Sequence, residues 1–468
     1  MTSSEGKAAL AVGARFGARL LEPPKHVAQR RLALEVLAAG LAAVDPYQAI
    51  HRHMSRSGSV LTIGSHQFDL DHVRRIIAVG AGKAGGPMAQ AVEEILGDRL
   101  SGGWINVKTG HLAPTRLVHL HEAGHPIPDE DSILGTRKIV ELLRELDSND
   151  LVLGLISGGG SALLTLPRSG VQLHDLQATT SLLLRAGADI NQLNTVRKHL
   201  DQIKGGGLAR CASPAQIVTL ILSDVIGDPL DVIASGPTVP DPTSFANVCS
   251  VIDQFDLWPA LPPTVAGVLQ RGRAGLEQET AKPGDPIFER VVTCIVGSNA
   301  QAAQAALGTA REQGWATIDL GSMLEGEARE VGRMLGGFAR SIAAEARPFA
   351  PPACIVAGGE TVVTVRGIGV GGRNQELALG AAIAIEGLPD TLIVSLGTDG
   401  TDGPTDAAGA IADGSTLERA RAHRLDAHRA LAQNDSYGYF ATLGDLLVTG
   451  PTRTNVNDLI CVFVGMPV

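Results

Sequence analysis

A glycine-rich turn near residue 80 has the composition of an anion-binding site. Residues 80–85 follow the pattern G-x-G-x-x-G with Lys83 inside it, between a predicted strand and a predicted helix. At the start of a helix, backbone N–H groups and the positive end of the helix dipole favour anions. A lysine at such a turn adds a charge that suits phosphate oxygens. We therefore interpret Gly80, Gly82 and Lys83 as part of a nucleotide phosphate site.

Two other nucleotide-binding motifs must be weighed at the same turn. A Walker A loop is excluded, because Ile77 occupies its first glycine position and Ala84 follows the lysine. A dinucleotide-binding fold expects an acidic residue about 20 positions further on, at the end of the next strand. That strand, residues 104–107, ends in Lys108, which removes the NAD signature but would tolerate NADP. An NAD(P)H-dependent reductase therefore stays open as an alternative.

Two further glycine clusters lie in the first half of the chain. One offers backbone N–H groups and two hydroxyls to a phosphate or a carboxylate, and it consists of Ser157, Gly158, Gly159, Gly160 and Ser161. It lacks the G-x-S-x-G order of a serine-hydrolase nucleophile elbow. The other, residues 205–207, follows the basic residues Arg197, Lys198 and Lys204. These side chains either contact a substrate or cover a helix surface, and the sequence leaves both roles open.

In the second half, a glycine run at 367–372 ends in Arg373 at a predicted helix start. The forked donors of an arginine match phosphate oxygens in pairs. Polar groups gather close by in the sequence, namely Glu360, Asn374, Gln375 and Glu376. This clustering favours a second anion-binding site over a hairpin with an arginine cap.

Phosphoryl transfer needs cations, usually Lys or Arg together with Mg²⁺ held by one or two carboxylates. Asp224 and Asp399 each follow an apolar strand, and in doubly wound folds ligands bind at the carboxyl ends of strands. Glu360 and Asn455 stand beside further strands, whereas we interpret Asp402 and Asp406 as turn residues. The thirteen histidines show no ligand spacing typical of a transition metal.

The elements that position these groups alternate along the chain. Strands are predicted at 74–79, 151–156 and 216–222, each followed by a glycine or polar turn and then helical spacing. This order is typical of a doubly wound parallel sheet in an α/β protein. One long amphipathic helix is predicted over 27–53. In the second half, strands are predicted at 291–296, 353–357, 361–366, 391–396 and 459–464.

A chain of 468 residues exceeds what one hydrophobic core usually serves, so we expect two domains with a cleft between them. Five prolines between 257 and 286 indicate the boundary. The predicted organisation is a flexible segment over 1–26, an α/β domain over 27–285 and a C-terminal α/β domain over 286–468.

Composition excludes several classes of function. A net charge of −10 without a Lys/Arg-rich run argues against nucleic acid. The five cysteines are scattered and show no C-x-x-C pair, as expected of reduced thiols in a cytoplasmic protein. No run reaches the ~18 apolar residues of a membrane span, so we expect a protein without a membrane partner.

Several segments, in order from about residue 30 to the end, resemble those of the class II glycerate 2-kinases. They are VGAGKA at 79–84, HPIPD at 125–129, ISGGGSALL at 156–164, LSDVIGDPLDVIASGPT at 222–238, GGETVVTV at 358–365, GGRNQELAL at 371–379, GTDGTDGPTDAAGA at 397–410 and TGPTRTNVNDL at 449–459. Some relatives in this family carry the label hydroxypyruvate reductase.

The resemblance implies a larger Rossmann-like domain, a smaller C-terminal α/β domain and an active site in the cleft between them. It implies phosphorylation of D-glycerate by ATP with Mg²⁺, giving 2-phosphoglycerate and ADP. Lys83 and Arg373 would be the phosphate cations. Metal and substrate groups would be Asp224, Glu360, Asp399 and Asn455. As the general base for the 2-hydroxyl, our hypothesis names Asp224 or Asp399 and leaves the choice open.

Two rival functions stay open at this stage. One is the NAD(P)H-dependent hydroxypyruvate reductase indicated by the G-x-G-x-x-G turn, for which no general acid stands out beside an arginine. The other is a non-catalytic sensor of a sugar acid or nucleotide. The oligomeric state is also open, with a homodimer as one outcome.

Overall fold

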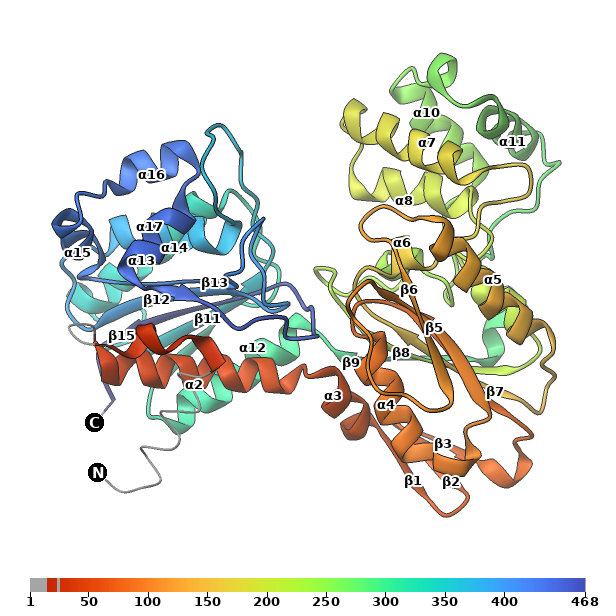
Figure 1. Cartoon of the computed structure of the whole chain (residues 1–468), viewed down its shortest axis with the longest axis horizontal. Helices are drawn as coiled ribbons and strands as arrows, with labels where there is room; N and C mark the ends of the chain where they lie inside the picture. Colours follow the sequence, from red (N-terminus) through yellow and green to blue (C-terminus); the bar gives the residue numbers. More distant parts are fainter. Residues whose placement is uncertain (1–14, 23–25, 468) are drawn as a thin grey trace. The chain divides into compact units, whose positions relative to one another are not determined.

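The computed structural model describes residues 15–22 and 26–467 (Figure 1). The chain forms two compact units. One unit is Pro46–Val296, here called the parallel-sheet unit. The other, the mixed-sheet unit, combines the described residues up to Asp45 with those from Gly297 onward. In the described part of the chain, no helix is both long enough and apolar enough to span a bilayer.

The parallel-sheet unit contains a six-stranded sheet in the order β6-β5-β4-β7-β8-β9. Its first five strands pair in parallel throughout. The strands are β4 (Ile76–Ala81), β5 (Gly102–Lys108), β6 (Val118–Ala123), β7 (Leu151–Ile156), β8 (Gln216–Leu222) and β9 (Val291–Gly297). The chain leaves β4 toward one edge and returns at β7 toward the other, so the switch point lies between these neighbours. The expected doubly wound sheet is confirmed.

Helices cover this sheet and build a separate helical layer. Both central strands are buried along their whole length, as expected for strands covered on both faces. The sheet carries α4 (Gly85–Leu96), α5 (Glu130–Arg144), α6 (Gly160–Leu163) and α9 (Gly207–Ala212). A second apolar core joins α7 (Leu173–Ala186), α8 (Ile190–His199), α10 (Phe245–Gln254) and α11 (Pro263–Arg273), which gather at one end of the unit (Figure 1).

Three short strands and a helix complete the parallel-sheet unit. The strands β1 (Met54–Ser57), β2 (Val60–Ile63) and β3 (His66–Asp69) form an antiparallel sheet of their own. The helix before them is α3 (Pro46–His53).

The mixed-sheet unit holds a six-stranded sheet in the order β10-β11-β15-β12-β13-β14. Among these described strands, β10 and β11 pair in parallel, and the other pairs are antiparallel. The strands are β10 (Ala316–Asp319), β11 (Ala353–Gly359), β12 (Thr391–Gly397), β13 (Gly409–Asp413), β14 (Leu446–Leu447) and β15 (Asp458–Val464). One apolar core joins the sheet to α2 (Val27–Ala43) and α12 (Asn299–Glu312), and another joins it to α13 (Ala328–Glu345) and α14 (Arg373–Ala384). Beside α14 lie α15 (Thr416–Ala422), α16 (Ala427–Gln433) and α17 (Ser436–Leu443).

The single helix predicted over 27–53 is wrong, because it divides into α2 and α3 at Asp45. Pro46 explains the break: proline lacks the N–H that a continuing helix needs. Helix α2 belongs to the mixed-sheet unit, and α3 belongs to the parallel-sheet unit. Buried Arg30 on α2 donates to Asp413 at 2.5 Å and to Asp445 at 2.8 Å, which ties α2 to the mixed sheet.

The unit boundaries therefore differ from the single division expected near residue 285. The chain changes units after Asp45 and again at Gly297, and β9 completes the parallel sheet. Of the predicted flexible segment 1–26, residues 1–14 and 23–25 lie outside the described residues. Phe16 and Leu20 within that segment are buried in the core of the mixed-sheet unit.

The strand predicted over 361–366 is also wrong, because this segment is a loop. Val362 makes an isolated bridge to Glu327: its N–H donates to Gly326 O at 2.9 Å, and its carbonyl accepts from Ala328 N–H at 2.8 Å. The next residues bond side chains and do not extend the bridge into a strand. Thr364 N–H donates to the carboxylate of Glu327, and the N–H groups of Arg366 and Gly367 donate to Asn434 Oδ1. The alternating valines that suggested a strand are therefore left partly on the surface.

Candidate functional site

The turns after β4 and β7 lie against each other at the switch point of the parallel sheet. A Cβ added to Gly80 would lie 1.9 Å from the carbonyl oxygen of Leu155. Gly82 has φ +145°, and a Cβ there would lie 2.0 Å from Ser157 Oγ. Only glycine permits this approach, which brings Lys83 beside the turn that contains Ser157 to Ser161.

Hydrogen bonds between the two turns occupy much of the first predicted phosphate cradle. Lys83 N–H donates to Gly158 O at 2.8 Å, and Ala84 N–H donates to Ser157 Oγ at 3.0 Å. Gly82 N–H donates to Asn106 O at 3.0 Å. The expectation that these N–H groups face an anion is therefore wrong for the β4 turn. The buried hydroxyl of Ser157 takes part in holding the two turns together.

The β7 turn keeps more of its binding capacity. In the described part of the chain, the N–H groups of Gly158 and Gly159 have no protein acceptor. Gly159 has φ +85°, a conformation that favours glycine. Ser161 is partly exposed, and its Oγ lies 2.5 Å from Ser235 Oγ. This turn is thus the better phosphate or carboxylate site of the two.

His125 lies beside the β7 turn and close to Lys83. A Cβ on Gly159 would lie 3.0 Å from His125 Nε2 and 3.6 Å from Lys83 Cγ. Burial, together with the charge of Lys83 and more weakly that of Lys108, lowers the pKa of His125 to about 4. The imidazole is therefore uncharged at neutral pH. The sequence alone assigned no contact to His125, although the segment HPIPD had marked it.

Asp224 follows β8 and is partly exposed. Because β4, β7 and β8 run parallel, their carboxyl ends meet at one edge of the sheet. Lys83, the β7 turn and Asp224 therefore share that edge.

The mixed-sheet unit contains a pocket of about 620 Å³. This volume falls within the range of small-molecule sites, about 300–1,000 Å³. Three predicted site residues line it, namely Arg373, Asp399 and Asn455. Other polar walls come from Asp402, Asn434 and Asn457, and an apolar wall comes from Val362, Val363 and Val365.

Two carboxylates hold the guanidinium of Arg373. Its Nε and Nη2 donate to the two oxygens of Asp458 at 2.7 and 3.0 Å, and its Nη1 donates to Glu360 at 2.6 Å. Burial alone would lower the pKa of Arg373, but Asp458 and Glu360 raise it. The arginine is thus permanently charged and held in one orientation, with two of its five N–H groups left for a ligand.

Asp458 is the main residue of this pocket region to which the sequence assigned no role. It begins β15 and is 1% exposed. Burial raises the pKa of Asp458 to about 6, although Arg373 opposes this shift. Asn374 Nδ2 donates to Asp458 at 3.0 Å, and Ser395 Oγ donates to Asn374 Oδ1 at 2.5 Å. Its place beside Asn455 in the segment NVNDL was the available signal.

Asp402 caps the helix that carries Arg373. It accepts from the N–H groups of Asn374 at 3.1 Å and of Gln375 at 2.9 Å, at the start of α14. Burial raises the pKa of Asp402 in spite of these bonds. The turn role expected for Asp402 thus extends to positioning α14, and its bonds occupy N–H groups that an anion would otherwise use.

The three predicted metal ligands do not all belong to one unit. Glu360 and Asp399 are in the mixed-sheet unit, and Asp224 is in the parallel-sheet unit. Among the residues that the structure describes, no three His, Cys, Asp or Glu side chains form a ready cage for a metal ion. Asp399 Oδ1 accepts from the N–H and the hydroxyl of Thr401, both at 3.0 Å.

We predict that Arg373→Met lowers the free energy of unfolding by about 3–5 kcal/mol, because it leaves Asp458 buried and unpaired. The double variant Arg373→Met/Asp458→Leu should regain most of that loss. Urea denaturation measures both. The control is Arg333→Met, which removes an exposed pair with Glu330 and should change stability by less than about 1 kcal/mol. Equal losses in the single and double variants would contradict the pairing.

A second prediction concerns His125, whose pKa is lowered to about 4 in the folded chain from its ordinary value of 6.5. Between these values the unfolded chain binds a proton that the folded chain does not, so stability falls as pH falls from about 6.5 to 4. His125→Gln removes this contribution. Urea denaturation from pH 7 to 4 should therefore show a steeper loss for the wild type than for the variant. Parallel curves would show that His125 titrates normally.

Family models match segments in both halves of the chain. Residues 32–270 match a domain of unknown function, DUF4147, and residues 353–458 match the MOFRL family. The chain is 43% identical to D-glycerate 2-kinase of Thermotoga maritima over 92% of this chain and 97% of that protein. It is 40% identical to a putative hydroxypyruvate reductase of Agrobacterium vitis over 94% of this chain and 95% of that protein.

The fold has a solved counterpart. The crystal structure of a glycerate kinase from Thermotoga maritima matches with a TM-score of 0.83 and 42% identity, over 93% of this chain and 99% of that one. The chain belongs to the glycerate kinase family defined by the DUF4147 and MOFRL domains.

Proposed function

We propose that this protein transfers the terminal phosphoryl group of ATP to the 2-hydroxyl of D-glycerate, giving 2-phosphoglycerate and ADP. The observation that carries the proposal is the forked guanidinium of Arg373, held by Asp458 and Glu360 at a pocket of nucleotide size. The similarity to D-glycerate 2-kinase supports the choice of acceptor. Lys83 at the switch point supplies the second cation for the transferred charge.

We propose that the pocket of the mixed-sheet unit takes the nucleotide. Its wall of Val362, Val363 and Val365 suits the apolar faces of a base, and Arg373 and Asn455 suit phosphate and sugar oxygens. The remaining N–H groups of Arg373 would bind phosphate oxygens. The β7 turn and Ser161 then remain for the smaller substrate or for phosphate.

The donor set fits Mg²⁺. Mg²⁺ usually binds one or two carboxylates together with substrate phosphates and waters, so it needs no preformed protein cage. Asp399 lines the pocket and is partly exposed, and Asn455 adds an amide oxygen. We propose Asp399, with Glu360 or Asp224, as the metal carboxylates. When bound, the ion would neutralise charge on the phosphates. The general base stays open between Asp224 and Asp399.

A hydroxypyruvate reductase remains the second candidate, because one relative carries that name. The β4 turn argues against it. A dinucleotide pyrophosphate binds the N–H groups of such a turn, but here those of Gly82, Lys83 and Ala84 donate to the chain itself.

The test incubates the full chain with D-glycerate and Mg-ATP and identifies the product by phosphorus NMR. We expect 2-phosphoglycerate in amounts equal to the ADP released. A parallel incubation with hydroxypyruvate and NADH or NADPH should show no enzyme-like loss of reduced cofactor. Steady cofactor oxidation without a phosphorylated product would establish the reductase, and binding without turnover would establish the sensor.

For Lys83→Ala we predict a fall in turnover of about 100-fold or more, because a cation aimed at developing negative charge is worth several kcal/mol. The matched control is Lys138→Ala, which removes an exposed ion pair with Glu141 on α5 and should leave turnover unchanged. Thermal unfolding verifies that both variants fold. Normal turnover in folded Lys83→Ala would refute its role.

The cytoplasmic location and a homodimer stay predictions.

A further inference from the structure

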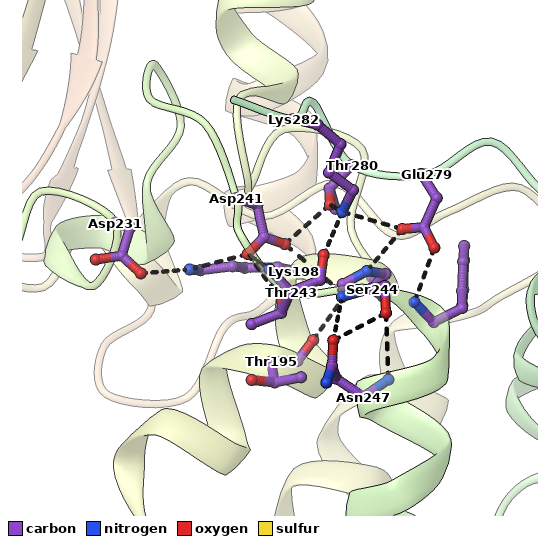
Figure 2. A network of polar contacts seen from close by, with 12 residues as sticks. Thr195, Lys198, Asp231, Asp241, Thr243, Ser244, Asn247, Glu279, Thr280 and Lys282 are labelled. Atoms are coloured by element: carbon purple, nitrogen blue, oxygen red, sulfur yellow. Dashed lines mark hydrogen bonds and ion pairs between the residues drawn. The ribbon is translucent and has the colours of Figure 1, made fainter. Parts of the chain in front are cut away.

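The end of α8 carries three basic residues in a row, Arg197, Lys198 and His199. The structure accounts for two of them. Lys198 Nζ lies 3.1 Å from Asp231 and 3.4 Å from Asp241 (Figure 2). His199 Nε2 lies 3.0 Å from Glu279. These buried contacts fix the rotation of α8 about its axis.

The polar network around Asp241 anchors this end of α8 further. Thr243 Oγ1 and Thr280 Oγ1 donate to Asp241 at 2.8 and 2.9 Å (Figure 2). Lys282 pairs with Glu279 at 3.1 Å. Each cation in the network thus has a carboxylate, and each carboxylate has donors. The ammonium of Lys198 is thus paired by carboxylates of the chain.

Arg197 differs from its neighbours. Its guanidinium is partly buried, and burial lowers its pKa. Among the residues that the structure describes, no carboxylate, carbonyl or hydroxyl accepts from it. Lys204, the third basic residue of this region, has Asp201 at 2.9 Å and Leu164 O at 2.7 Å. A desolvated charge without a partner is energetically costly. An anion that binds here therefore gains an ion pair that the protein itself does not supply.

Hydrogen bonds locate the face of α8 on which Arg197 lies. Asn194 precedes Arg197 by three residues, so both lie on one side of the helix. Asn194 Oδ1 accepts from Ser235 Oγ at 3.2 Å, and Ser235 Oγ lies 2.5 Å from Ser161 Oγ. This side of α8 therefore faces the β7 turn, where Gly158 and Gly159 keep their N–H groups.

The segment between α8 and the β7 turn has an unusual backbone. Ala234 and Ser235 have φ of 50° and 61°, a left-handed conformation that is strained for a residue with a side chain. Gly205 N–H donates to Ser235 O at 3.0 Å, and Gly206 N–H donates to Gly236 O at 2.8 Å. The third glycine cluster thus holds this strained segment in place, which aims Ser235 at both Asn194 and Ser161.

We propose that Arg197 binds the carboxylate of the acceptor hydroxy acid, with the hydroxyl of Ser161 as a neighbouring donor. This inference rests on the proposed function and adds the residue that selects an acid over a neutral polyol. Arginine suits this role because its two parallel N–H groups match a carboxylate. The two arginines then have different roles, since Arg373 is paired by carboxylates of the chain and Arg197 is left for the substrate.

The experiment compares the wild type with Arg197→Met and Arg197→Lys, using D-glycerate and its neutral amide as acceptors. For Arg197→Met we expect the KM for D-glycerate to rise about 30-fold or more, with the KM for ATP unchanged. The KM of Arg197→Lys should lie between those of the wild type and Arg197→Met, because lysine keeps the charge and lacks the two parallel N–H groups. The amide should be a poor substrate for the wild type, and its KM should rise little further in the variants.

Two controls separate binding from folding. Arg273→Met, which removes an exposed arginine on α11, should leave every constant unchanged. The thermal midpoint of Arg197→Met should stay level or rise, because a desolvated unpaired charge is removed. Calorimetric titration of D-glycerate onto each full-length variant gives an affinity that does not depend on turnover.

An unchanged affinity for D-glycerate in Arg197→Met would overturn the inference, as would equal losses with the acid and the amide. A rise in the KM for ATP alone would assign Arg197 to the nucleotide and overturn it as well. If the wild type binds D-glycerate and does not phosphorylate it, the proposed function fails while the carboxylate site stands on the titration.

Discussion

The pairing of Arg373 with Asp458 is the interaction on which the candidate site depends most. Loss of either partner of a buried carboxylate–arginine pair strongly destabilises a protein, because the remaining charge is buried without a partner. Such a pair is therefore retained only where its geometry is good. Here Asp458 begins the central strand β15, and Arg373 begins α14. The pair therefore joins a strand end to a helix start and sets the orientation of the guanidinium before any ligand binds. Such preorganisation is the usual source of electrostatic catalysis.

The two units solve the problem of anion binding in different ways. In the mixed-sheet unit, Asp402 and Asp458 accept from donors at the start of α14, and two N–H groups of Arg373 are left for a ligand. In the parallel-sheet unit, the nested glycine turns use up most of their own N–H groups. We propose Lys83, the β7 turn and Arg197 for binding in that unit, so side chains would place most of the charge and backbone amides would have the smaller part.

Much of this could be predicted from sequence, and the failures have physical causes. Apolar strands followed by glycine turns predicted β7 and β8 to the residue, because strands covered on both faces are apolar throughout. Pro46 was overlooked as a helix break. The assignment of α2 to the mixed-sheet unit was therefore also missed, since it depends on ion pairs with the distant Asp413 and Asp445. The valines at 362 and 365 imitated a strand. Beyond an isolated bridge at Val362, their loop bonds side chains, which periodicity does not reveal. Arg373, Asp399 and Asn455, each named from the sequence, line one pocket. Asp458 received no role, because its partners Arg373 and Asn374 are distant in the chain.

The pH dependence of turnover in wild type and Asp458→Asn tests most directly whether ionised Asp458 holds Arg373 for catalysis. The pKa of Asp458 is raised to about 6, so its carboxylate is charged above that pH and protonated below it. Turnover of the wild type should therefore fall as pH decreases through about 6. Asp458→Asn should be slower at neutral pH and should lack this acid limb. A wild-type rate that is level down to pH 5, or an acid limb that persists in the variant, would contradict the account.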